Sequence, residues 1–464
     1  MPTSVDAIVI GSGQAGPFLA AKLAAAGRRT VLIEREHLGG TCVNDGCIPT
    51  KTMVASARAA HIARRAAEFG VRFAGPVTVD MRSVKERKDQ VVGQSVDNLT
   101  EWLGGVKNLR LVWGHARFTA PHAVQVGDET LSAPQVFINT GGRAVMPDWP
   151  GIENVRVLNN TSMMALEDLP EHLVVIGGSY IGLEFAQMMR RFGSRVTVIE
   201  MAERVIARED PEVSRELQAI LEREGVVFHL GVRGAKLSVA NGGTRFRVAL
   251  NSGRVAHELE GSHLLAAIGR RPNTDDLGLD RAGITTDARG FIGVDDQLRT
   301  NVPGVWALGD CNGRGAFTHT AYNDHEIVAA NLLDGASRRV GDRIPAYALF
   351  TDPPLGRVGL SETEVRASGR PALVGTMPMT RVGRARERGE TQGFMKVLVD
   401  ARTERILGAA LLCIEGDEIV HSLLDAMYCG APFTVLRDAV HIHPTVSELI
   451  PTLLANLKPL ELAA

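Results

Sequence analysis

Short apolar runs rich in β-branched residues recur along the chain, and two of them lead directly into glycine-rich turns. The first run covers residues 5–10 and is followed by Gly-Ser-Gly-Gln-Ala-Gly at 11–16. Runs of this length and type are typical of strands buried on both faces of a parallel sheet. The residues after the turn predict a helix that ends near Gly27, so the order is strand, glycine turn, helix.

The glycine turn at 11–16 has the spacing of a pyrophosphate-binding loop. Gly11 allows the tight turn, Gly13 lets a pyrophosphate approach the backbone, and Gly16 lets the helix pack against the strand. The next predicted strand ends in Glu34, 23 positions after Gly11, where a carboxylate is suited to bind ribose hydroxyls. A strand before the turn, a helix after it and this acid together predict a dinucleotide site.

The same layout returns at residues 173–200. A second apolar run leads into a turn that contains Gly177 and Gly182, and the following strand ends in Glu200, again 23 positions after the first glycine. Ser179 replaces the middle glycine, so its Cβ narrows the approach of a pyrophosphate, while its hydroxyl can hydrogen-bond a phosphate oxygen. Two copies with the same internal spacing predict two bound dinucleotides.

Two of the five cysteines, Cys42 and Cys47, are separated by four residues and follow the glycine pair at 39–40. Such a pair can be core filler, half of a metal site or a redox-active pair. The other three cysteines are scattered singly, so a four-ligand zinc site lacks a second pair. We expect both thiols to enter a helix, whose positive N-terminal end favours the thiolate needed for disulfide exchange or metal capture.

Other segments predict elements without assigned chemistry. Residues 80–103 predict a long helix with Asp80 as its N-cap, and residues 110–126 predict a small β-meander. From about residue 344 onward the pattern is one of strands and helices with no glycine turn.

Composition places the chain among ordinary globular proteins, because 45% of its 464 residues are hydrophobic, 22% are charged and the net charge is -2. The length suits about three domains of ~150 residues each. There is no basic surplus for nucleic acid or an anionic membrane, so we expect small-molecule partners. No apolar run approaches the ~20 residues needed to cross a bilayer, and the first residues do not resemble a signal peptide, so we expect a cytoplasmic protein.

The run Gly-Gly-Thr-Cys-Val-Asn-Asp-Gly-Cys-Ile-Pro-Thr-Lys at 39–51 resembles the active-site signature of the flavoprotein disulfide reductases, and matching motifs recur from Val5 to Glu448. The resemblance implies an α/β fold with two Rossmann-like dinucleotide-binding domains and a C-terminal α+β dimerisation domain. It assigns FAD to the first glycine turn and NAD(P) to the second. We predict an FAD-binding domain at 1–144 and 269–338, an NAD(P)-binding domain at 145–268 and a dimerisation domain at 339–464.

The resemblance also implies how the thiols react. NAD(P)H gives hydride to the flavin, the flavin reduces the Cys42–Cys47 disulfide, and the dithiol reduces a bound acceptor. The second cysteine faces the flavin in the family, so Cys47 would form the charge-transfer thiolate and Cys42 would attack the substrate. Lys51 and Glu184 match a family salt bridge beside the reactive edge of the flavin, although two such distant charges are otherwise a surface ion pair.

Near the C-terminus, His443 and Glu448 match the family's His-Pro-x-x-x-Glu dyad. Imidazole shuttles protons near neutral pH, and a carboxylate fixes its tautomer and raises its basicity. In the resembled fold the C-terminal domain pairs about a two-fold axis and places its histidine in the neighbouring active site. We therefore expect a homodimer whose active sites are shared between chains.

Further cofactor-binding residues follow from the same resemblance. Asp310 holds the place of an aspartate that binds the ribitol of FAD, although Gly-Asp after a strand is otherwise a plain turn. Tyr180 stands where the family has a ring that gates nicotinamide entry, with helix-face packing as the alternative. We expect NADH in preference to NADPH, because Glu200 would repel a 2′-phosphate. The remaining predicted cofactor-binding residues are Gly40, Thr41, Lys51, Thr140, Gly141 and Gly269.

The motifs at 317–320 and 350–359 most resemble the mercuric-reductase-like branch, which includes the copper reductase of reactive-chlorine resistance. Mercuric reductases of the usual kind carry a C-terminal cysteine pair, whereas the last cysteine here is Cys429. The predicted acceptor is a disulfide or a soft metal ion, since thiolates suit Hg(II) and Cu(I). Dihydrolipoyl dehydrogenase is the alternative enzyme. A redox-sensing flavoprotein without turnover is the alternative of another class, against which the histidine dyad argues because a sensor needs no general acid.

Overall fold

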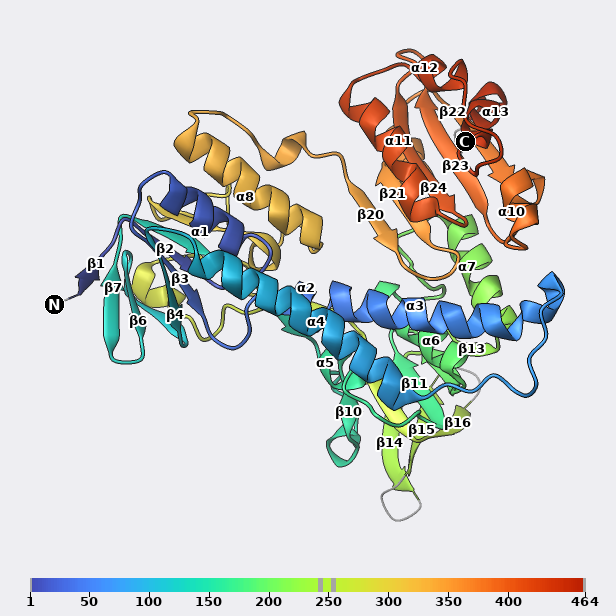
Figure 1. The fold of residues 1–464 in the computed structure, drawn as a ribbon, viewed down its shortest axis with the longest axis horizontal. Coiled ribbons are helices and arrows are strands. Elements are labelled where there is room, and N and C mark those ends of the chain that lie inside the picture. The colour runs from blue at the N-terminus through green and yellow to red at the C-terminus, as the bar shows by residue number, and fades with distance from the viewer. Residues whose placement is uncertain (1, 241–244, 252–255, 462–464) are drawn as a thin grey trace.

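A computed structural model describes residues 2–240, 245–251 and 256–461. Figure 1 shows three bodies: the N-terminal sheet with its helices on the left, the green and yellow-green elements below on the right, and the C-terminal domain in orange and red above them. The long helix α3, Cys47–Arg64, crosses the middle of the molecule between them. The predicted α/β fold is confirmed.

The first nucleotide-binding sheet is parallel, with strand order β19-β8-β2-β3-β4. Its central strand β2 is apolar throughout and buried on both faces, as expected for a parallel sheet covered on two sides. Ala7 and Val9 pack with helices α1 and α8, whereas Ile8 and Ile10 pack with the strands of a small antiparallel sheet. The elements are β2 (Ala7–Ile10), α1 (Gly16–Ala25), β3 (Thr30–Glu34), β4 (Leu109–Trp113), β8 (Gln135–Ile138), β19 (Val305–Ala307) and α8 (Thr318–Leu333).

The predicted meander at 110–126 is wrong in its extent. Residues of β4 pair in parallel with β3 and extend the nucleotide-binding sheet, so they are not part of the meander. The antiparallel strands are β5, β6 and β7, and β1 joins β7 in parallel. Alternation of apolar residues predicts a strand but does not identify its partner, which explains the error. These strands are β1 (Thr3–Ser4), β5 (Ala116–Ala120), β6 (Ala123–Val126) and β7 (Glu129–Ser132).

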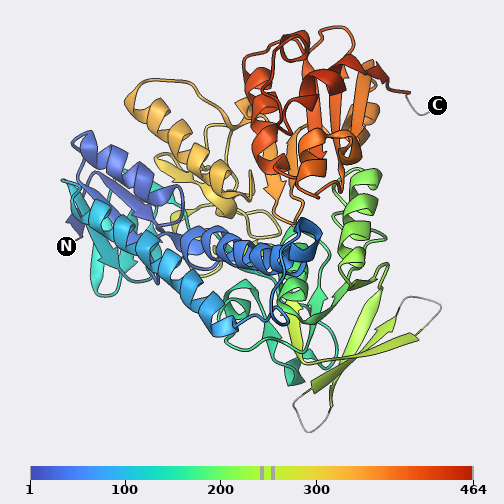
Figure 2. The same cartoon turned by 45° about the vertical axis from the view of Figure 1, so that its right-hand side comes forward.

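The second nucleotide-binding sheet repeats the parallel arrangement, with order β10-β17-β11-β12-β13. Leu173 and Val175 pack with helix α6, and Val174 and Ile176 pack with the three-stranded sheet β14-β15-β16, which projects outward in Figure 2. The elements are β10 (Val157–Leu158), α5 (Asn160–Met163), β11 (His172–Ile176), α6 (Tyr180–Phe192), β12 (Arg195–Ile199), α7 (Pro211–Arg223), β13 (Val226–His229), β14 (Gly234–Ala240), β15 (Arg245–Asn251), β16 (Ala256–Gly261) and β17 (His263–Ala266).

A short antiparallel ribbon joins the two passages of the chain between these sheets. Its strands are β9, Gly142–Ala144, and β18, Arg270–Pro272. The predicted domain boundaries after residues 144 and 268 fall beside this ribbon.

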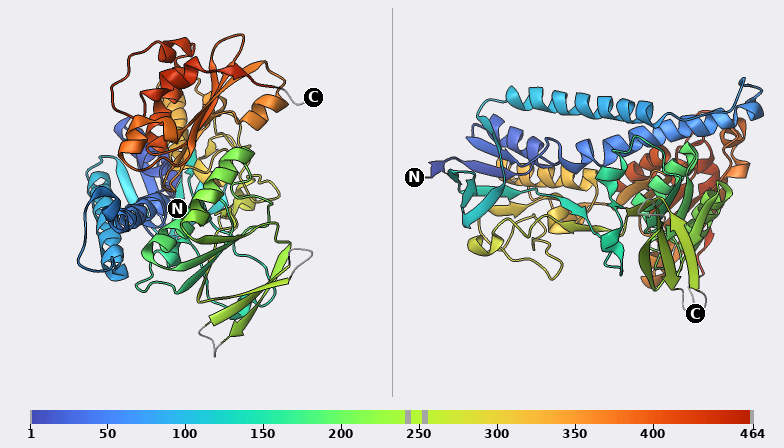
Figure 3. Two further views of the ribbon diagram at one scale, coloured as in Figure 1. Left: turned by 90° about the vertical axis from the view of Figure 1, so that its right-hand side faces the viewer. Right: turned by 90° about the horizontal axis from the view of Figure 1, so that it is seen from below.

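The predicted helix at 80–103 is confirmed as α4, Met81–Gly104, and Asp80 accepts hydrogen bonds from the backbone nitrogens of Arg82 and Ser83. Figure 3 shows α4 lying alongside α3.

The C-terminal domain is built on a six-stranded sheet of order β20-β21-β24-β23-β22-β25, in which each pair is antiparallel. Its elements are β20 (Ala346–Leu349), β21 (Leu355–Gly359), α9 (Glu362–Ala367), β22 (Ala372–Pro378), α10 (Gly383–Glu387), β23 (Phe394–Asp400), β24 (Ile406–Leu412), α11 (Gly416–Tyr428), α12 (Thr434–Arg437), α13 (Leu449–Ala455) and β25 (Lys458–Pro459).

Candidate active site

The two candidate thiols lie on different helices. Cys42 belongs to the short helix α2, Gly40–Asn44, and Cys47 is the first residue of α3. The expectation that both enter one helix is therefore wrong. The chain breaks at Gly46, where a Cβ would lie 2.7 Å from the carbonyl oxygen of Thr41, so only glycine allows the two short segments to approach this closely. Both thiols are free in the structure.

The surroundings of the two thiols separate their acidities. A hydrogen bond from Cys42 is the main cause that lowers the pKa of Cys47, to about 6, with further contributions from Thr318 and from the charge of Lys51. The Thr318 hydroxyl, at the first residue of α8, lies 2.9 Å from Cys47 Sγ. The same hydrogen bond and burial raise the pKa of Cys42. Cys47 thus carries the thiolate and Cys42 the thiol, so Cys42 must lose its proton before it can attack a disulfide.

The ion pair predicted between Lys51 and Glu184 is present. Lys51 lies one turn after Cys47 on α3, and its Nζ is 2.8 Å from Glu184 Oε2 on α6. Glu184 is 6% exposed and also accepts a hydrogen bond from the backbone nitrogen of Phe350, whose ring lies 4.6 Å from Lys51 Nζ. The pair therefore connects α3, α6 and the start of the C-terminal domain close to Cys47.

The first glycine turn is held in place by a residue that the sequence analysis missed. Asn139 accepts a hydrogen bond from the backbone nitrogen of Gly16 at 2.9 Å and donates one to the carbonyl of Leu308 at 3.0 Å. A Cβ on Gly16 would lie 2.0 Å from the carbonyl oxygen of Gly11, which explains the third glycine of the motif. The signal for Asn139 was its place directly after the buried strand β8, at the carboxyl edge of the parallel sheet.

Glu34 and Glu200, the acids at the ends of the strands that follow the two glycine turns, each accept hydrogen bonds from the backbone of the preceding turn. Glu34 receives four hydrogen bonds, from the backbone nitrogens of Ser12, Arg35 and Glu36 and from the Ser12 hydroxyl. Glu200 receives two, from the backbone nitrogens of Gly178 and Ala202. A carboxylate offers about four acceptor positions, so Glu200 has free positions for ribose hydroxyls, whereas Glu34 would have to release a protein donor.

Several other predicted cofactor-binding residues meet where the thiol segment touches the first glycine turn. A Cβ on Gly40 would lie 2.9 Å from the Cα of Gly13, so these two backbones are in close contact. Arg270 reaches the Thr41 hydroxyl at 3.4 Å and lies 3.6 Å from Asp310. Burial raises the pKa of Asp310, and Arg270 opposes this effect.

The residues between the two domains fit a dinucleotide at the first sheet. Thr140 Oγ1 is buried and makes no hydrogen bond within the described residues, so it is available to a bound group. The carbonyls of Thr140 and Gly141 accept hydrogen bonds from Asn273, and Gly269 accepts one from the backbone of Val145. The second turn is built in the same way as the first: a Cβ on Gly182 would lie 2.0 Å from Gly177 O, and Ser179 precedes α6 as its N-cap.

Tyr180, the predicted nicotinamide gate, is the first residue of α6, four positions before Glu184. Its hydroxyl donates a hydrogen bond to Glu209 Oε1 at 2.9 Å. Glu209 is 2% exposed and was not identified from the sequence, because it lies in the charged loop after Glu200, outside the motif that ends there.

The predicted acid–base dyad forms, but away from the thiols. His443 Nδ1 lies 2.7 Å from Glu448 Oε2, and the His443 side chain is 79% exposed. The dyad lies between α12 and α13, and Glu448 Oε1 lies 3.9 Å from where a Cβ on Gly383, at the start of α10, would stand. Neighbouring apolar side chains are also exposed, Val440 at 99% and Ile442 at 80%. Within the described residues, no hydrogen bond or ion pair of one chain connects the dyad with the thiols.

Within the described ranges, no three or more His, Cys, Asp or Glu side chains are grouped so as to hold a metal ion. The described helices include none with the length and hydropathy required to span a membrane.

Comparison with known proteins places the chain among flavoenzymes. Residues 5–324 match the family profile of pyridine nucleotide-disulphide oxidoreductases, and residues 345–454 match the dimerisation domain of that family. The chain is 36% identical to the probable pyridine nucleotide-disulfide oxidoreductase RclA of Escherichia coli over 98% of this chain and 99% of that protein. It is 34% identical to dihydrolipoyl dehydrogenase 2 of Haloarcula marismortui and to the mercuric reductase of Streptomyces lividans, each over 97% of this chain and 95% of the relative.

The structure resembles solved structures of the same Escherichia coli protein. The HOCl-induced flavoprotein disulfide reductase RclA superposes with a TM-score of 0.89 at 36% identity, over 98% of this chain and 100% of that one. Its Cu(II) complex superposes with a TM-score of 0.89 at 35% identity, over 98% and 99% of the two chains.

Proposed function

The chain belongs to the pyridine nucleotide-disulphide oxidoreductase family, and on this basis we propose that it uses its Cys42–Cys47 pair to reduce a disulfide or a soft metal ion. The protein is an oxidoreductase of a family that uses FAD and NAD(P)H. FAD, when bound, carries electrons from NAD(P)H to the cysteine pair. The proposal concerns the acceptor and the residues that serve it.

The asymmetric thiol pair is the observation that carries the proposal. Cys47, with its pKa lowered to about 6, is ionised at neutral pH, while the raised pKa keeps Cys42 protonated until an acceptor binds. Oxidation of this thiolate–thiol pair to a disulfide releases two electrons and the one proton of Cys42. The electrons reduce one disulfide to two thiols, one Hg(II) to Hg(0), or two Cu(II) to two Cu(I); the proton goes to a product thiol or to a base, and a second product thiol takes its proton from solvent.

The other site residues support this reaction. Lys51, paired with Glu184 at 2.8 Å, places a positive charge beside Cys47 and stabilises its thiolate. We assign the proton transfer to His443, oriented by Glu448, in the active site of the opposite subunit of a homodimer. The match of residues 345–454 to a dimerisation domain supports this arrangement.

A soft metal ion is supported as the acceptor by thiolate chemistry and by two relatives. Thiolates select Cu(I) and Hg(II), and similar proteins include a mercuric reductase and a flavoprotein disulfide reductase whose structure was solved as a Cu(II) complex. Because no ready-made metal cluster lies within the described residues, we propose that the ion is bound transiently by the cysteine pair as substrate.

The test is steady-state NADH oxidation with disulfides, Cu(II), Hg(II), quinones and oxygen as acceptors. We expect one disulfide or metal ion to exceed oxygen, and this activity to fall by about 10²-fold or more in Cys42→Ser because the attacking sulfur is lost. Cys429→Ser is the matched control, since Cys429 is an exposed single cysteine, and it should behave as the wild type. If no acceptor exceeds oxygen, the proposed reductase activity is wrong and a sensor role gains support.

The electron donor can be tested in the same assay. Glu200 has acceptor positions free for a ribose 2′-hydroxyl and would repel a 2′-phosphate, so kcat/KM should be higher with NADH than with NADPH. Glu200→Gln removes the repulsion and should narrow the ratio by roughly tenfold, or ~1.4 kcal/mol. A higher kcat/KM with NADPH in the wild type would contradict the assignment.

Dihydrolipoyl dehydrogenase is the second candidate, favoured by the 34% identity to dihydrolipoyl dehydrogenase 2. Reduction of NAD+ by dihydrolipoamide distinguishes the two candidates. Turnover faster than with any metal ion or other disulfide would establish this candidate instead.

A further inference from the structure

The hydroxyl of Tyr180 donates a hydrogen bond to the buried carboxylate of Glu209, which has no part in the proposed reaction. Glu209 Oε1 accepts hydrogen bonds from Tyr180 at 2.9 Å and from Tyr347 at 2.6 Å. The two tyrosine rings also contact each other edge to face, with centroids 5.8 Å apart. Tyr180 belongs to the second nucleotide-binding domain and Tyr347 to β20 of the C-terminal domain, so one oxygen atom links residues of two domains.

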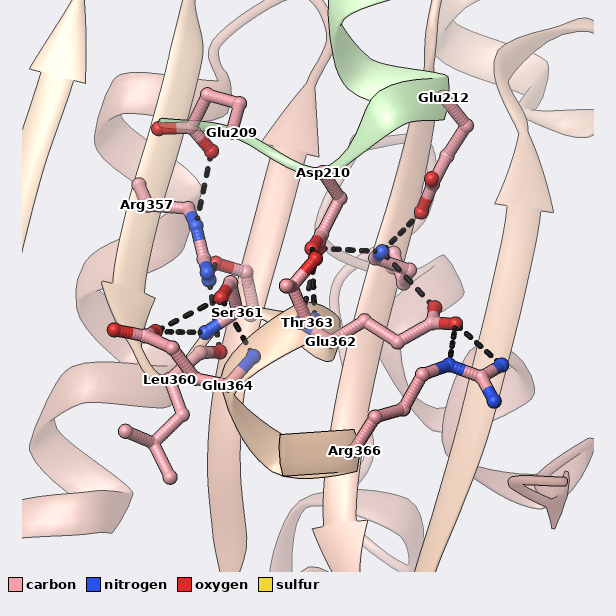
Figure 4. A network of polar contacts seen from close by, with 12 residues as sticks. Glu209, Asp210, Glu212, Arg357, Leu360, Ser361, Glu362, Thr363, Glu364 and Arg366 are labelled. Atoms are coloured by element: carbon pink, nitrogen blue, oxygen red, sulfur yellow. Dashed lines mark hydrogen bonds and ion pairs between the residues drawn. The ribbon is translucent and has the colours of Figure 1, made fainter. Parts of the chain in front are cut away.

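Glu209 is itself held rigidly, as Figure 4 shows. Its Oε2 accepts a hydrogen bond from Arg357 Nε at 3.1 Å, and the two side chains are 2% and 3% exposed. Arg357 donates its other hydrogen bonds to the backbone carbonyls of Val358, Leu360 and Ala409. Because Nε of Arg357 donates to Glu209 and its Nη1 to backbone carbonyls, the guanidinium is fixed at two of its nitrogens, which limits movement of the carboxylate.

Asp210, the residue after Glu209, attaches the same loop to the C-terminal domain. Asp210 accepts hydrogen bonds from the backbone nitrogens of Glu362 and Thr363, both at 3.0 Å, at the start of α9. It also forms a 2.7 Å ion pair with Lys396 Nζ. The loop that carries Glu209 is thus attached to the C-terminal domain by backbone and side chain together.

A second contact connects the anchored tyrosines with the thiolate. Tyr347 stacks on Phe317 at 5.3 Å between ring centroids, with the ring planes 5° apart. The next residue, Thr318, is the one whose hydroxyl lies 2.9 Å from Cys47 Sγ. The hydroxyls remain donors at neutral pH, because burial raises the pKa of both Tyr180 and Tyr347.

We propose that Glu209, with Tyr347, is a positioning residue that holds Tyr180 in one orientation and so controls the entry of the nicotinamide coenzyme. Tyr180 and Glu184 are four positions apart and share a face of α6, so the tyrosine ring lies on the side of the Lys51–Glu184 pair. Movement of the ring requires its hydrogen bond to Glu209 to break. This inference rests on the proposed function for the use of a nicotinamide coenzyme and on the predicted gating role of Tyr180.

Two measurements that need no acceptor test the proposal in the FAD-containing enzyme. One is NAD+ affinity by calorimetry, and the other is the rate of flavin bleaching after anaerobic mixing with NADH. Tyr180→Phe removes the hydrogen bond, whereas Glu209→Gln replaces its charged acceptor by a neutral amide oxygen, so both variants should shift both quantities in the same direction, by about 3- to 30-fold and less for Glu209→Gln. The two effects should not add, and the double variant should match Tyr180→Phe, because without the hydroxyl the charge of Glu209 no longer holds that ring.

Additional variants separate positioning from folding. Tyr347→Phe keeps the aromatic packing and removes one of the two donors, so it should give a smaller shift in the same direction. Glu203→Gln is the matched control, because Glu203 is exposed on the same loop, and it should leave both quantities unchanged. Thermal unfolding of each variant identifies any loss of folded protein.

The outcomes are distinct from those of the acceptor assay. Wild-type values in Glu209→Gln, or effects of Tyr180→Phe and Glu209→Gln that add in the double variant, would overturn the inference. An absence of bleaching by NADH in the wild type would instead overturn the proposed electron donor. Failure of every acceptor leaves bleaching measurable, so the role of Glu209 can be decided even if the proposed reductase activity is wrong.

Discussion

The thiol pair and the acid–base dyad are the two halves of the candidate active site, and they differ in how complete they are. Around Cys47, one chain supplies the hydrogen-bonding thiol of Cys42, the hydroxyl of Thr318 and the charge of Lys51. His443 has only Glu448, and its side chain is 79% exposed to solvent. The thiol pair receives its stabilising contacts from one chain, whereas the His443–Glu448 dyad lies exposed at the surface of that chain.

This difference indicates what each half requires. A thiolate is stabilised by nearby donors and positive charge, which a single folded chain can provide. A general acid–base must also lie within hydrogen-bond reach of the group that it serves, which the exposed dyad does not achieve within one chain. The exposed apolar residues Val440 and Ile442 beside it favour a second subunit as the missing part.

The largest effect should come from separating the two halves by mutation. Cys42→Ala and His443→Ala homodimers should each be badly impaired, the latter by roughly 10²–10⁴-fold if the imidazole acts as general acid–base. Co-expressed, the two variants should restore activity, because one site of a mixed dimer combines an intact Cys42 with an intact His443. Random pairing makes about half of the dimers mixed, each with one working site, so about a quarter of wild-type activity should return.

Differently tagged subunits allow the mixed dimer to be purified before assay. As a control, a dimer of Cys42→Ala with Cys42→Ala/His443→Ala should stay inactive, because neither site has its thiol. If purified mixed dimers are no more active than the mutant homodimers, the histidine works within its own chain or is not catalytic.

A second experiment examines the asymmetry inside the thiol half. In the reduced enzyme, Cys42→Ser should keep a long-wavelength thiolate-to-flavin absorption band, because the serine hydroxyl can still donate a hydrogen bond to Cys47. Cys47→Ser should lose the band, since only the flavin-facing sulfur can donate charge to the ring. Visible spectra with the opposite pattern would exchange the roles of the two cysteines.

The smallest effect concerns the tuning of the thiolate. The pKa of Cys47 is lowered from 9.0 to about 6, so the thiolate and its band should persist above pH 6 and disappear as the pH falls through about 6. Thr318→Val removes one hydrogen bond to the sulfur and should move this midpoint upward by about one pH unit. Thr52→Val is the control, because Thr52 lies on α3 with Cys47 and its hydroxyl donates a hydrogen bond to the carbonyl of Ile48. An unchanged midpoint in Thr318→Val would show that the threonine does not stabilise the thiolate.

The free energy of unfolding of the reduced protein should also depend on the ionisation of Cys47. Because the folded-state pKa of Cys47 lies below that of an unfolded thiol, ionisation favours the folded state at alkaline pH. That contribution should decline as the pH falls from about 8.5 towards 6, and it should be absent below this range.

Local sequence patterns were sufficient for both glycine turns and for Glu34 and Glu200, which bind back to the backbone of those turns. Gly11 and Gly16, and equally Gly177 and Gly182, approach each other closely enough to exclude a Cβ, a constraint visible in the spacing alone. The salt bridge of Lys51 with Glu184 and the dyad of His443 with Glu448 were predicted from family motifs, and the structure contains both contacts.

Other features were missed because their partners are distant in sequence. Asn139 holds the first glycine turn from 123 positions away, and Tyr347 reaches Glu209 across 138 positions. The place of Asn139 directly after β8 puts it at the edge of the sheet but does not identify its partner, and no local pattern marks Tyr347. The break between α2 and α3 was also missed, because it depends on the close approach of Gly46 to Thr41 rather than on helix propensity.

Sequence by itself determined the two dinucleotide turns, the candidate redox pair and the family of the enzyme, since each depends on residue types at short fixed spacing. Tertiary structure alone decided which thiol is acidic, which carboxylate has free acceptor positions and where the dyad lies. Those properties depend on burial, on hydrogen-bond donors and on charges brought together from segments more than a hundred residues apart. A pKa or an exposed surface is a property of the assembled environment, so it exists only once the chain has folded.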